Sequence, residues 1–486
     1  MKSRSLLAIL VVAMFVSTAT VAVVTFTDDD SVAASNITKV NVDAAGNDIT
    51  NIVEEGGIIT VGSGALRWVS YVGMMYDVKC IDYGDINAAS QNGKGYRALF
   101  DLDNVNKVNS AGIVKKYGSE PNNPPLESDL KDFGMTIHSH NNFTTADLEE
   151  LGKWSNVPKT MVVIKPIYDK FTPELKSGII NLGIKFVVIR DCLNFVNDDL
   201  TLHDDFLMNL AIMGTTFGKI ATINELVDQI NMHVGAIKGM IKGKTPKFDS
   251  AYIGAASNAG GKSLTWTVGD YLPFKLAGVK NAYTKGTTVS EDAGSEVMSK
   301  TTPEVIFMDL SSTTKFVGSD PGSNAVLKYA ELKNVPIYTI LPYFWFGYNF
   351  DNAIANAYYL VYVCYDGILS FDDVVKKVGS VYGAFYPELK KEKMDIGEKT
   401  YSGGDIIMPY MMTKFYSAKG TKLTLDGNCL KVTVGEGKNI FEITERPKGN
   451  VNSSGSGDDN SMIIISVAVV AIIAIGLLGY ALFKRR

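Results

Sequence analysis

Short apolar runs alternate with segments of helical spacing along most of this chain. Residues 58–61 form a β-branched run, residues 62–64 read Gly-Ser-Gly, and residues 65–72 carry apolar side chains at helical spacing. These patterns predict a strand, a tight turn and a helix, in that order. Because the first N–H groups of a helix lack partners within the helix, such a turn presents donors to a ligand. We therefore expect Ser63 and Arg67 to face a binding cleft.

The same alternation continues through the middle of the chain. Residues 161–165 and 186–189 are apolar runs of strand length, and residues 173–182 between them have helical spacing. Strands that alternate with helices in this way favour a parallel sheet covered by helices on both faces. The pattern then resumes, with strands expected at 248–254 and 335–341 and a helix at 349–363. Two successive α/β units are thus predicted.

One long amphipathic helix is expected between the two units. The sequence Thr222-Ile-Asn-Glu225 fits a capping box at its N-terminus. Apolar residues then recur at helical spacing from Leu226 to Ile241, and Gly243 ends the pattern. A helix of about twenty residues is roughly 30 Å long, which is enough to span a small domain.

The predicted fold class is α/β, with two Rossmann-like lobes whose parallel central sheets are joined by a single long helix. A small C-terminal β extension is added, because residues 422–434 and 440–445 alternate like antiparallel strands. The expected segments are a signal peptide or N-terminal anchor (1–34), an N-terminal lobe (36–205), linking helices (206–244), a C-terminal lobe (245–386), the β extension (387–447), a flexible stalk (448–461), a transmembrane helix (462–483) and a basic cytoplasmic tail (484–486).

Both ends of the chain carry long apolar runs. Residues 5–26 and 462–483 are each long enough to cross a hydrocarbon core of about 30 Å as a helix. The basic residues beside both runs are expected on the cytoplasmic side, which places the folded part outside the cell. The first run is either a cleaved signal peptide or an anchor. The expected location is the cell membrane, with a single-pass C-terminal anchor and an extracellular folded domain, as on an archaeal cell surface.

Composition narrows the range of partners. The 486 residues carry a net charge of −5, and the Lys and Arg residues are dispersed, which argues against nucleic acid as a partner. The four cysteines are far apart and show no CxxC metal spacing. Buried thiols and one disulfide both stay open for them, and the four residues are Cys80, Cys192, Cys364 and Cys429.

Several motifs occur in an order typical of one protein family. Residues 43–49 read DAAGNDI, residues 62–66 read GSGAL and residues 78–82 read VKCID. Further along, residues 294–309 read GSEVMSKTTPEVIFMD and residues 349–363 read NFDNAIANAYYLVYV. This series resembles the class III solute-binding proteins that serve ABC importers of ferric siderophores, haem and cobalamin. The resemblance covers about residues 40–386, and its form here is that of a membrane-anchored archaeal member.

The resemblance implies a function and a set of partners. It implies an extracellular protein that captures a metal chelate of the ferric siderophore, haem or cobalamin class and delivers it to the permease subunits of an ABC importer. In this family an acidic residue on each lobe pairs with arginines of the transporter. The matching positions here are Glu296 and either Glu149 or Glu150. We expect a monomer without a resident cofactor, held to the membrane by its C-terminal helix.

Aromatic and polar residues near predicted strand ends are candidate ligand contacts. Residues 342–348 follow a predicted strand, where open α/β sheets bind their ligands, and include Tyr343, Trp345 and Tyr348. Their rings suit a flat, partly apolar chelate. Arginine candidates would neutralise an anionic chelate, or else form surface salt bridges. The remaining candidates are Ser63, Arg67, Tyr96, Arg97, Ser257 and Trp266.

Other functions have less support in the sequence. His138 and His140 have strand spacing, but a bare transition metal normally needs three or four converging ligands, so we expect a solvated loop and no metal site there. Residues 260–263 read GGKS but lack the first glycine of a phosphate loop. No GxSxG motif is present, and we expect no enzyme. The alternative to solute binding is a surface adhesion or cell-envelope protein that reuses the two-lobe fold.

Overall fold

The computed structural model of the protein describes most of the chain between residues 36 and 444. The described residues are 36–50, 52, 56–86, 136–193, 195–257, 263–285, 289–309, 321–344, 348–391, 393–396, 399–402, 431–434 and 441–444. The expectations for segments 1–34, 448–461, 462–483 and 484–486 concern residues outside this part of the chain.

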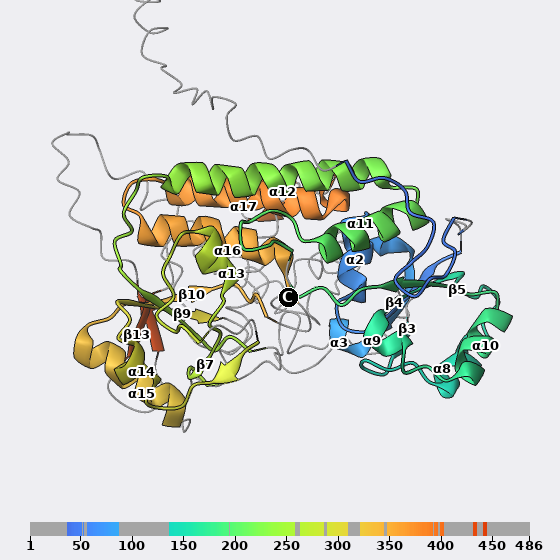
Figure 1. Cartoon of the computed structure of the whole chain (residues 1–486), viewed down its shortest axis with the longest axis horizontal. Coiled ribbons are helices and arrows are strands. Elements are labelled where there is room, and N and C mark those ends of the chain that lie inside the picture. Colours follow the sequence, from blue (N-terminus) through green and yellow to red (C-terminus); the bar gives the residue numbers. More distant parts are fainter. Residues whose placement is uncertain are drawn as a thin grey trace, which may run out of the picture. The chain divides into compact units, whose positions relative to one another are not determined.

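A five-stranded parallel sheet forms the first half of the described chain (Figure 1). The strands pair in the order β3-β2-β1-β4-β5, and every neighbouring pair is parallel. Their bounds are β1 (Ile58–Val61), β2 (Val78–Asp82), β3 (Thr136–His138), β4 (Thr160–Ile164) and β5 (Lys185–Ile189). All four residues of β1 are buried, as expected for the central strand of a sheet that is covered on both faces.

Short helices follow the strands of this first sheet. Thr144 caps α8 in a capping box, accepting from the Asp147 N–H while the Asp147 carboxylate accepts from the Thr144 N–H. The predicted helix at 173–182 is α10, with Thr172 as its cap. The elements are α2 (Ala65–Tyr71), η1 (Met75–Asp77), α3 (Tyr83–Ile86), α8 (Thr145–Leu151), α9 (Lys165–Tyr168) and α10 (Pro173–Asn181).

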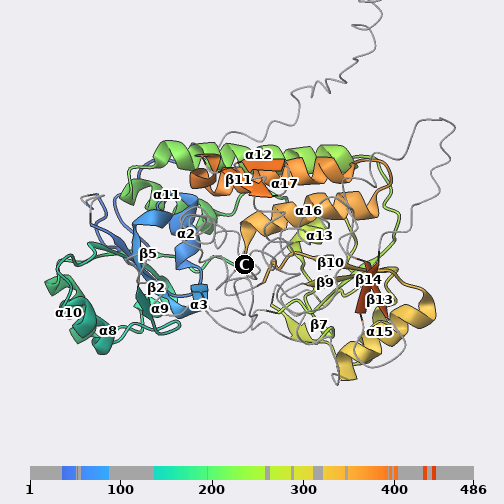
Figure 2. The same cartoon turned by 180° about the vertical axis from the view of Figure 1, so that it is seen from behind.

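A continuous helix connects the two sheets. α11 (Asp204–Thr216) is followed by α12 (Ile220–Ile241), which has 22 residues and buries one apolar face. The predicted capping box at Thr222 is wrong, because the helix begins two residues earlier and Thr222 lies inside it. The apolar face already starts at Ile223, one turn ahead of the predicted first position. In both views α12 lies beside α17 (Phe371–Phe385) (Figure 1, Figure 2).

The second sheet has a parallel core of three strands. β9 (Val305–Asp309) lies between β6 (Ala251–Gly254) and β10 (Ile337–Ile340). A short antiparallel pair, β7 (Trp266–Thr267) and β8 (Glu291–Asp292), lies beside it. The surrounding helices are α13 (Leu272–Leu276), α14 (Val297–Thr301), α15 (Pro321–Lys333), α16 (Phe350–Cys364) and α17. The predicted α/β class with two parallel sheets is confirmed.

The C-terminal β extension continues the second sheet. β13 (Lys431–Val434) pairs antiparallel with β14 (Phe441–Thr444), as the alternating pattern predicted, and also with β10. The sequence did not predict the hairpin of β11 (Lys393–Ile396) and β12 (Lys399–Ser402), which follows η3 (Pro387–Lys391). Because β13 hydrogen-bonds to β10, β13 and β14 extend the second sheet at its edge, whereas β11 and β12 form a separate two-stranded sheet.

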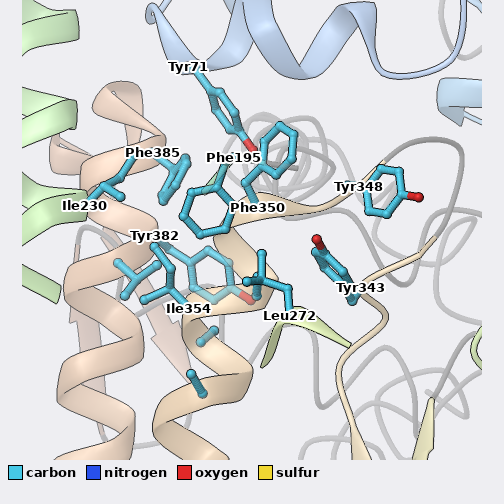
Figure 3. Packing of buried hydrophobic residues seen from close by; sticks show 14 of the residues in the cluster. Tyr71, Phe195, Ile230, Leu272, Tyr343, Tyr348, Phe350, Ile354, Tyr382 and Phe385 are labelled. Carbon is cyan, nitrogen blue, oxygen red and sulfur yellow. The ribbon is translucent and has the colours of Figure 1, made fainter. Parts of the chain in front are cut away.

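Buried rings join α2 to α16 and α17 (Figure 3). The rings of Trp68 and Phe350 lie 5.8 Å apart, and those of Tyr71 and Phe385 lie 4.8 Å apart, both in edge-on geometry. Figure 3 shows Tyr71 pointing from α2 toward Phe350 and Phe385. Edge-on ring pairs add stability beyond the apolar area that they bury. One continuous core therefore connects the first sheet to the helices of the second.

The predicted location in a cell membrane requires correction. Every helix among the residues described above is too short or too polar to cross a membrane. The expected C-terminal anchor at 462–483 lies outside those residues. The prediction of a membrane location, with the membrane as a partner, is therefore corrected for the described part of the chain, where no helix could span a membrane.

Candidate functional site

The strand order of the first sheet defines a switch point between β1 and β4. The chain moves outward from β1 to β2 and β3, and then returns to the other side of β1 with β4. Open α/β sheets bind ligands outside the carboxyl ends of the strands at such a point. The turn Gly62-Ser63-Gly64 directly follows β1 here, and both glycines have left-handed φ angles near 90°. Ser63 is partly exposed on this turn.

Asp82 holds the loops at this edge of the sheet together. It is the last residue of β2 and is fully buried. Its Oδ2 accepts the backbone N–H groups of Gly62 at 3.1 Å and Asn141 at 2.8 Å. Its Oδ1 accepts the N–H of Gly84 at 2.7 Å and the Nδ1–H of His140 at 3.0 Å. One buried carboxylate thereby fixes the chain beyond β1, β2 and β3.

His140 and Asn141 complete a cyclic set of hydrogen bonds with Ser63. The Nε2 of His140 accepts from the side-chain amide of Asn141 at 2.9 Å, which agrees with the Nδ1 proton facing Asp82. The Oδ1 of Asn141 accepts from the backbone N–H of Ser63 at 2.9 Å and from its hydroxyl at 3.0 Å. The imidazole side chain is 35% exposed, so this ring reaches the surface. We call Ser63, Asp82, His140 and Asn141 the Asp82 cluster.

Close backbone approach is part of this geometry. A Cβ atom at Gly84 would overlap the imidazole of His140, so only glycine allows the ring to lie against α3. The expectation of a solvated loop holds for His140, which is exposed on a turn, but is wrong for His138. His138 is buried at the end of β3, and its Nε2 lies 2.6 Å from the carbonyl oxygen of Thr60. The sequence signal that was missed is a histidine placed just beyond the end of a short strand.

The arrangement does not activate Ser63 as a nucleophile. The Ser63 hydroxyl lies 3.4 Å from Nδ1 of His140, the same nitrogen that donates to Asp82. A catalytic triad needs the serine and the carboxylate on opposite ring nitrogens, so that the ring can accept the serine proton. Within the parts of the chain that the structure describes, no group of three or more His, Cys, Asp or Glu side chains could hold a metal ion.

The second sheet places other predicted ligand contacts near its strand ends. Ser257 follows β6 and is fully buried, whereas Trp266 on β7 is partly exposed. Tyr343 and Tyr348 are buried, with their ring centroids 5.4 Å apart. Burial raises the pKa of Tyr343 well above its ordinary value. Direct contact between these side chains and a ligand stays a prediction, and Tyr96, Arg97 and Trp345 lie outside the described residues.

Arg67 lies inside the protein. It is 2% exposed on α2, and its Nη2 donates to the Oδ1 of Asn349 at 2.9 Å. Asn349 directly precedes α16, one of the helices that surround the second sheet. Arg67 thus connects the two sheets through a side-chain contact between residues that are 282 positions apart.

The three predicted docking glutamates are exposed. Glu149 and Glu150 lie on α8, and Glu150 pairs with Lys153 at 2.9 Å. Glu296 directly precedes α14 and pairs with Lys300 at 3.3 Å. Because these carboxylates are exposed, they are accessible to another protein. Exposed ion pairs of this kind contribute little to stability, so a partner can replace them at small cost. Docking of a permease stays a prediction.

Comparison with known proteins finds similarity at the level of solved structures. No family model and no curated protein matches the chain. It is similar to the TroA-like periplasmic binding protein FepB from Veillonella parvula, with 13% identity, 71% of this chain and 95% of that chain covered, and a TM-score of 0.44. It is also similar to the molybdate periplasmic binding protein MolA from Haemophilus influenzae, with 15% identity, coverage of 72% and 98%, and a TM-score of 0.47. The periplasmic heme-binding protein RhuT from Roseiflexus sp. RS-1 matches with 12% identity, coverage of 68% and 99%, and a TM-score of 0.36.

Proposed function

We propose that the protein binds a small solute and delivers it to an ABC importer. The Asp82 cluster is the observation that supports this proposal most. It lies at the carboxyl ends of β1, β2 and β3, where open α/β sheets bind ligands. A buried carboxylate there holds an exposed imidazole, an amide and a hydroxyl in fixed positions. Such preformed polar groups bind a ligand without a large cost of ordering them first.

A metal chelate is the solute class that we favour. His140 donates its Nδ1 proton to Asp82 and accepts from the Asn141 amide at Nε2, and this second bond requires a lone pair on Nε2. An imidazole whose second nitrogen donates to a carboxylate is the usual arrangement of a metal ligand. Nε2 accepts from the neutral side-chain amide of Asn141, which a metal centre with an open coordination position would displace. This supports haem or cobalamin, whose metal has an axial position for an imidazole, and a ferric siderophore would instead be held through hydrogen bonds to the exposed groups of the Asp82 cluster.

Binding titrations with the full-length protein test this proposal. The probes are a ferric hydroxamate, a ferric catecholate, haemin and cobalamin, each followed by quenching of tryptophan fluorescence. We expect saturable one-to-one binding of one class. His140→Asn should lower that affinity by about 10-fold to 100-fold, the range for a lost metal-binding partner.

The matched control for this titration is His203→Asn. His203 is exposed to a similar extent, 39%, but lies outside the Asp82 cluster, and asparagine can still cap α11. Affinity should be unchanged in this variant. Absence of saturable binding for all four probes, or equal losses in both variants, would contradict the proposal.

We further propose that Glu296, together with Glu149 or Glu150, contacts the permease. Exposed carboxylates at two ends of a body would orient it over a channel mouth through charge complementarity. Glu296→Arg should leave solute affinity intact but abolish uptake of labelled solute by cells, because repulsion replaces attraction. Glu331→Arg, an exposed glutamate on α15, is the control and should retain uptake. Wild-type uptake by the Glu296 variant would remove this residue from the docking surface.

A further inference from the structure

A buried polar network connects α2 with α16 and the end of α17. Arg67 and Tyr71 belong to α2, Asp351 belongs to α16, and Tyr386 directly follows α17. Each of these side chains is at most 2% exposed. Burying a charge is costly unless it is compensated, so these groups have to be held together in the folded protein.

Arg67 forms the first part of this network. Its Nη2 donates to the Oδ1 of Asn349 at 2.9 Å. The side-chain amide of Asn349 in turn donates to the carbonyl oxygens of Pro342 at 3.2 Å and Tyr343 at 3.3 Å. The backbone N–H of Asn349 donates to the same Tyr343 oxygen at 3.0 Å. A chain of hydrogen bonds therefore runs from α2, the helix that follows the Ser63 turn, to the turn that follows β10.

Asp351 forms the second part. Its Oδ2 accepts from the Tyr386 hydroxyl at 2.6 Å, and its Oδ1 lies 3.5 Å from the Tyr71 hydroxyl. Burial raises the pKa of Asp351, while the Tyr386 hydrogen bond and the positive charge of Arg67 oppose that rise. The guanidinium of Arg67 also lies 5.9 Å from the centre of the Phe350 ring. The positive charge of Arg67 thus interacts with the Asp351 carboxyl on α16.

We propose that Arg67 is a positioning residue that fixes the two sheets relative to each other, rather than a contact for the solute. The guanidinium is directed to Asn349 and is closed off from solvent. Its planar group donates to Asn349 and lies 5.9 Å from the centre of the Phe350 ring, a combination that a flexible ammonium does not reproduce. The consequence for solute capture rests on the proposed function, because both strand-end turns then stay at a fixed separation as the solute binds.

The distance between the two halves of the solute-free protein tests this inference directly. Spin-labelled unnatural amino acids at Ile180 on α10 and Leu332 on α15, both well exposed, report that distance by pulsed electron paramagnetic resonance. We expect one narrow distance distribution in the otherwise unchanged protein. Arg67→Met should broaden it or shift its mean by about 2 Å or more, the scale of a domain rearrangement. A broad distribution without the Arg67 substitution would overturn the inference.

Two further variants separate positioning from a general loss of stability. Val188→Ala removes buried volume within the first sheet and lowers stability, but should leave the distance distribution unchanged. Arg67→Lys keeps the positive charge near Asp351 but loses the fork that reaches Asn349, and should broaden the distribution as Arg67→Met does. An unchanged distribution in Arg67→Met, or equal broadening in Val188→Ala, contradicts the inference. Restoration of the narrow distribution by lysine would show that charge alone suffices, which overturns the role of Asn349.

These distance measurements need no solute. Their failure is therefore distinguishable from failure of the binding titrations. If the titrations fail while the distances behave as expected, the coupling of the two sheets stands and the proposed function does not.

Discussion

Asp82→Ala is expected to lower the free energy of unfolding by about 3 to 5 kcal/mol. The carboxylate accepts three backbone N–H groups and the His140 ring, and it is fully buried. Alanine would leave these donors without their partner, and the loss of a charged acceptor costs about 1.5 to 3 kcal/mol for each bond before the loops relax. Urea unfolding followed by circular dichroism measures the change.

Asp48→Ala serves as the matched control for Asp82. Asp48 is also a carboxylate that accepts from a backbone N–H and a side chain, both of Thr50, but it is exposed on the surface. Because water can replace the hydrogen bonds of this exposed carboxylate, Asp48→Ala should change the free energy of unfolding little. Equal destabilisation by the two substitutions would show that Asp82 does not hold the strand ends together.

The second large effect concerns the dependence of stability on pH at Glu388. The Oε1 of Glu388 accepts the backbone N–H of Met75 at 2.7 Å, and its Oε2 is buried without a hydrogen-bond partner in the described chain. Burial raises the pKa of this carboxyl from 4.5 to about 8, helped by the charge of Asp77 and opposed by the Met75 hydrogen bond. Between pH 4.5 and about 8, the Glu388 carboxyl is therefore protonated in the folded protein but ionised in the unfolded chain.

The sign of the effect follows from this raised pKa. The contribution of Glu388 to the free energy of unfolding is fully present below pH 4.5 and is lost as the pH rises through about 8. A shift of this size corresponds to at most roughly 5 kcal/mol at 1.36 kcal/mol per pKa unit, and we expect about 2 to 4 kcal/mol. Glutamine at position 388 has no proton to lose, so the decline in the free energy of unfolding between these pH values should shrink by that amount in Glu388→Gln.

Urea unfolding at several pH values between 4.5 and 8.5 checks the Glu388 prediction. Glu331→Gln, at an exposed position on α15, is the control and should retain the pH dependence of the unchanged protein. A Glu388→Gln profile parallel to that of the unchanged protein would mean that this carboxyl is already ionised in the folded state at neutral pH.

Local sequence patterns predicted much of the fold. The β-branched run at 58–61 coincides with β1, and the helical spacing at 349–363 lies within one residue of α16. These elements follow from periodicity and residue type, which are local properties. The predicted start of α12 was two residues too late, because Thr222 and Glu225 fit a capping box, whereas the apolar face of the helix already begins at Ile223. The β11 and β12 hairpin was not predicted, because its strands read KMDI and KTYS and their polar residues weaken the apolar pattern of a strand.

The site was harder to predict, because its contacts join distant parts of the chain. Ser63 was recognised from its glycine-rich turn, whereas its partner Asn141 is 78 residues away and carries no local motif. The role of His140 depends on Asp82, 58 residues earlier, and on the absence of a Cβ at Gly84. Arg67 follows the same turn and was expected to face a ligand, yet its neighbour Asn349 lies 282 residues away inside the core. Periodicity places a side chain on one face of a helix but does not identify what covers that face.

Native mass spectrometry of the full-length protein, purified from cells that produce it in iron-containing and cobalamin-containing medium, tests the central claim most directly. Solute binding through the Asp82 cluster predicts a complex of one protein and one metal-containing small molecule. The proportion of this complex should fall in His140→Asn and persist in His203→Asn. A spectrum that shows only the solute-free protein, also after haemin, cobalamin and both ferric siderophores have been added, would contradict the proposed function.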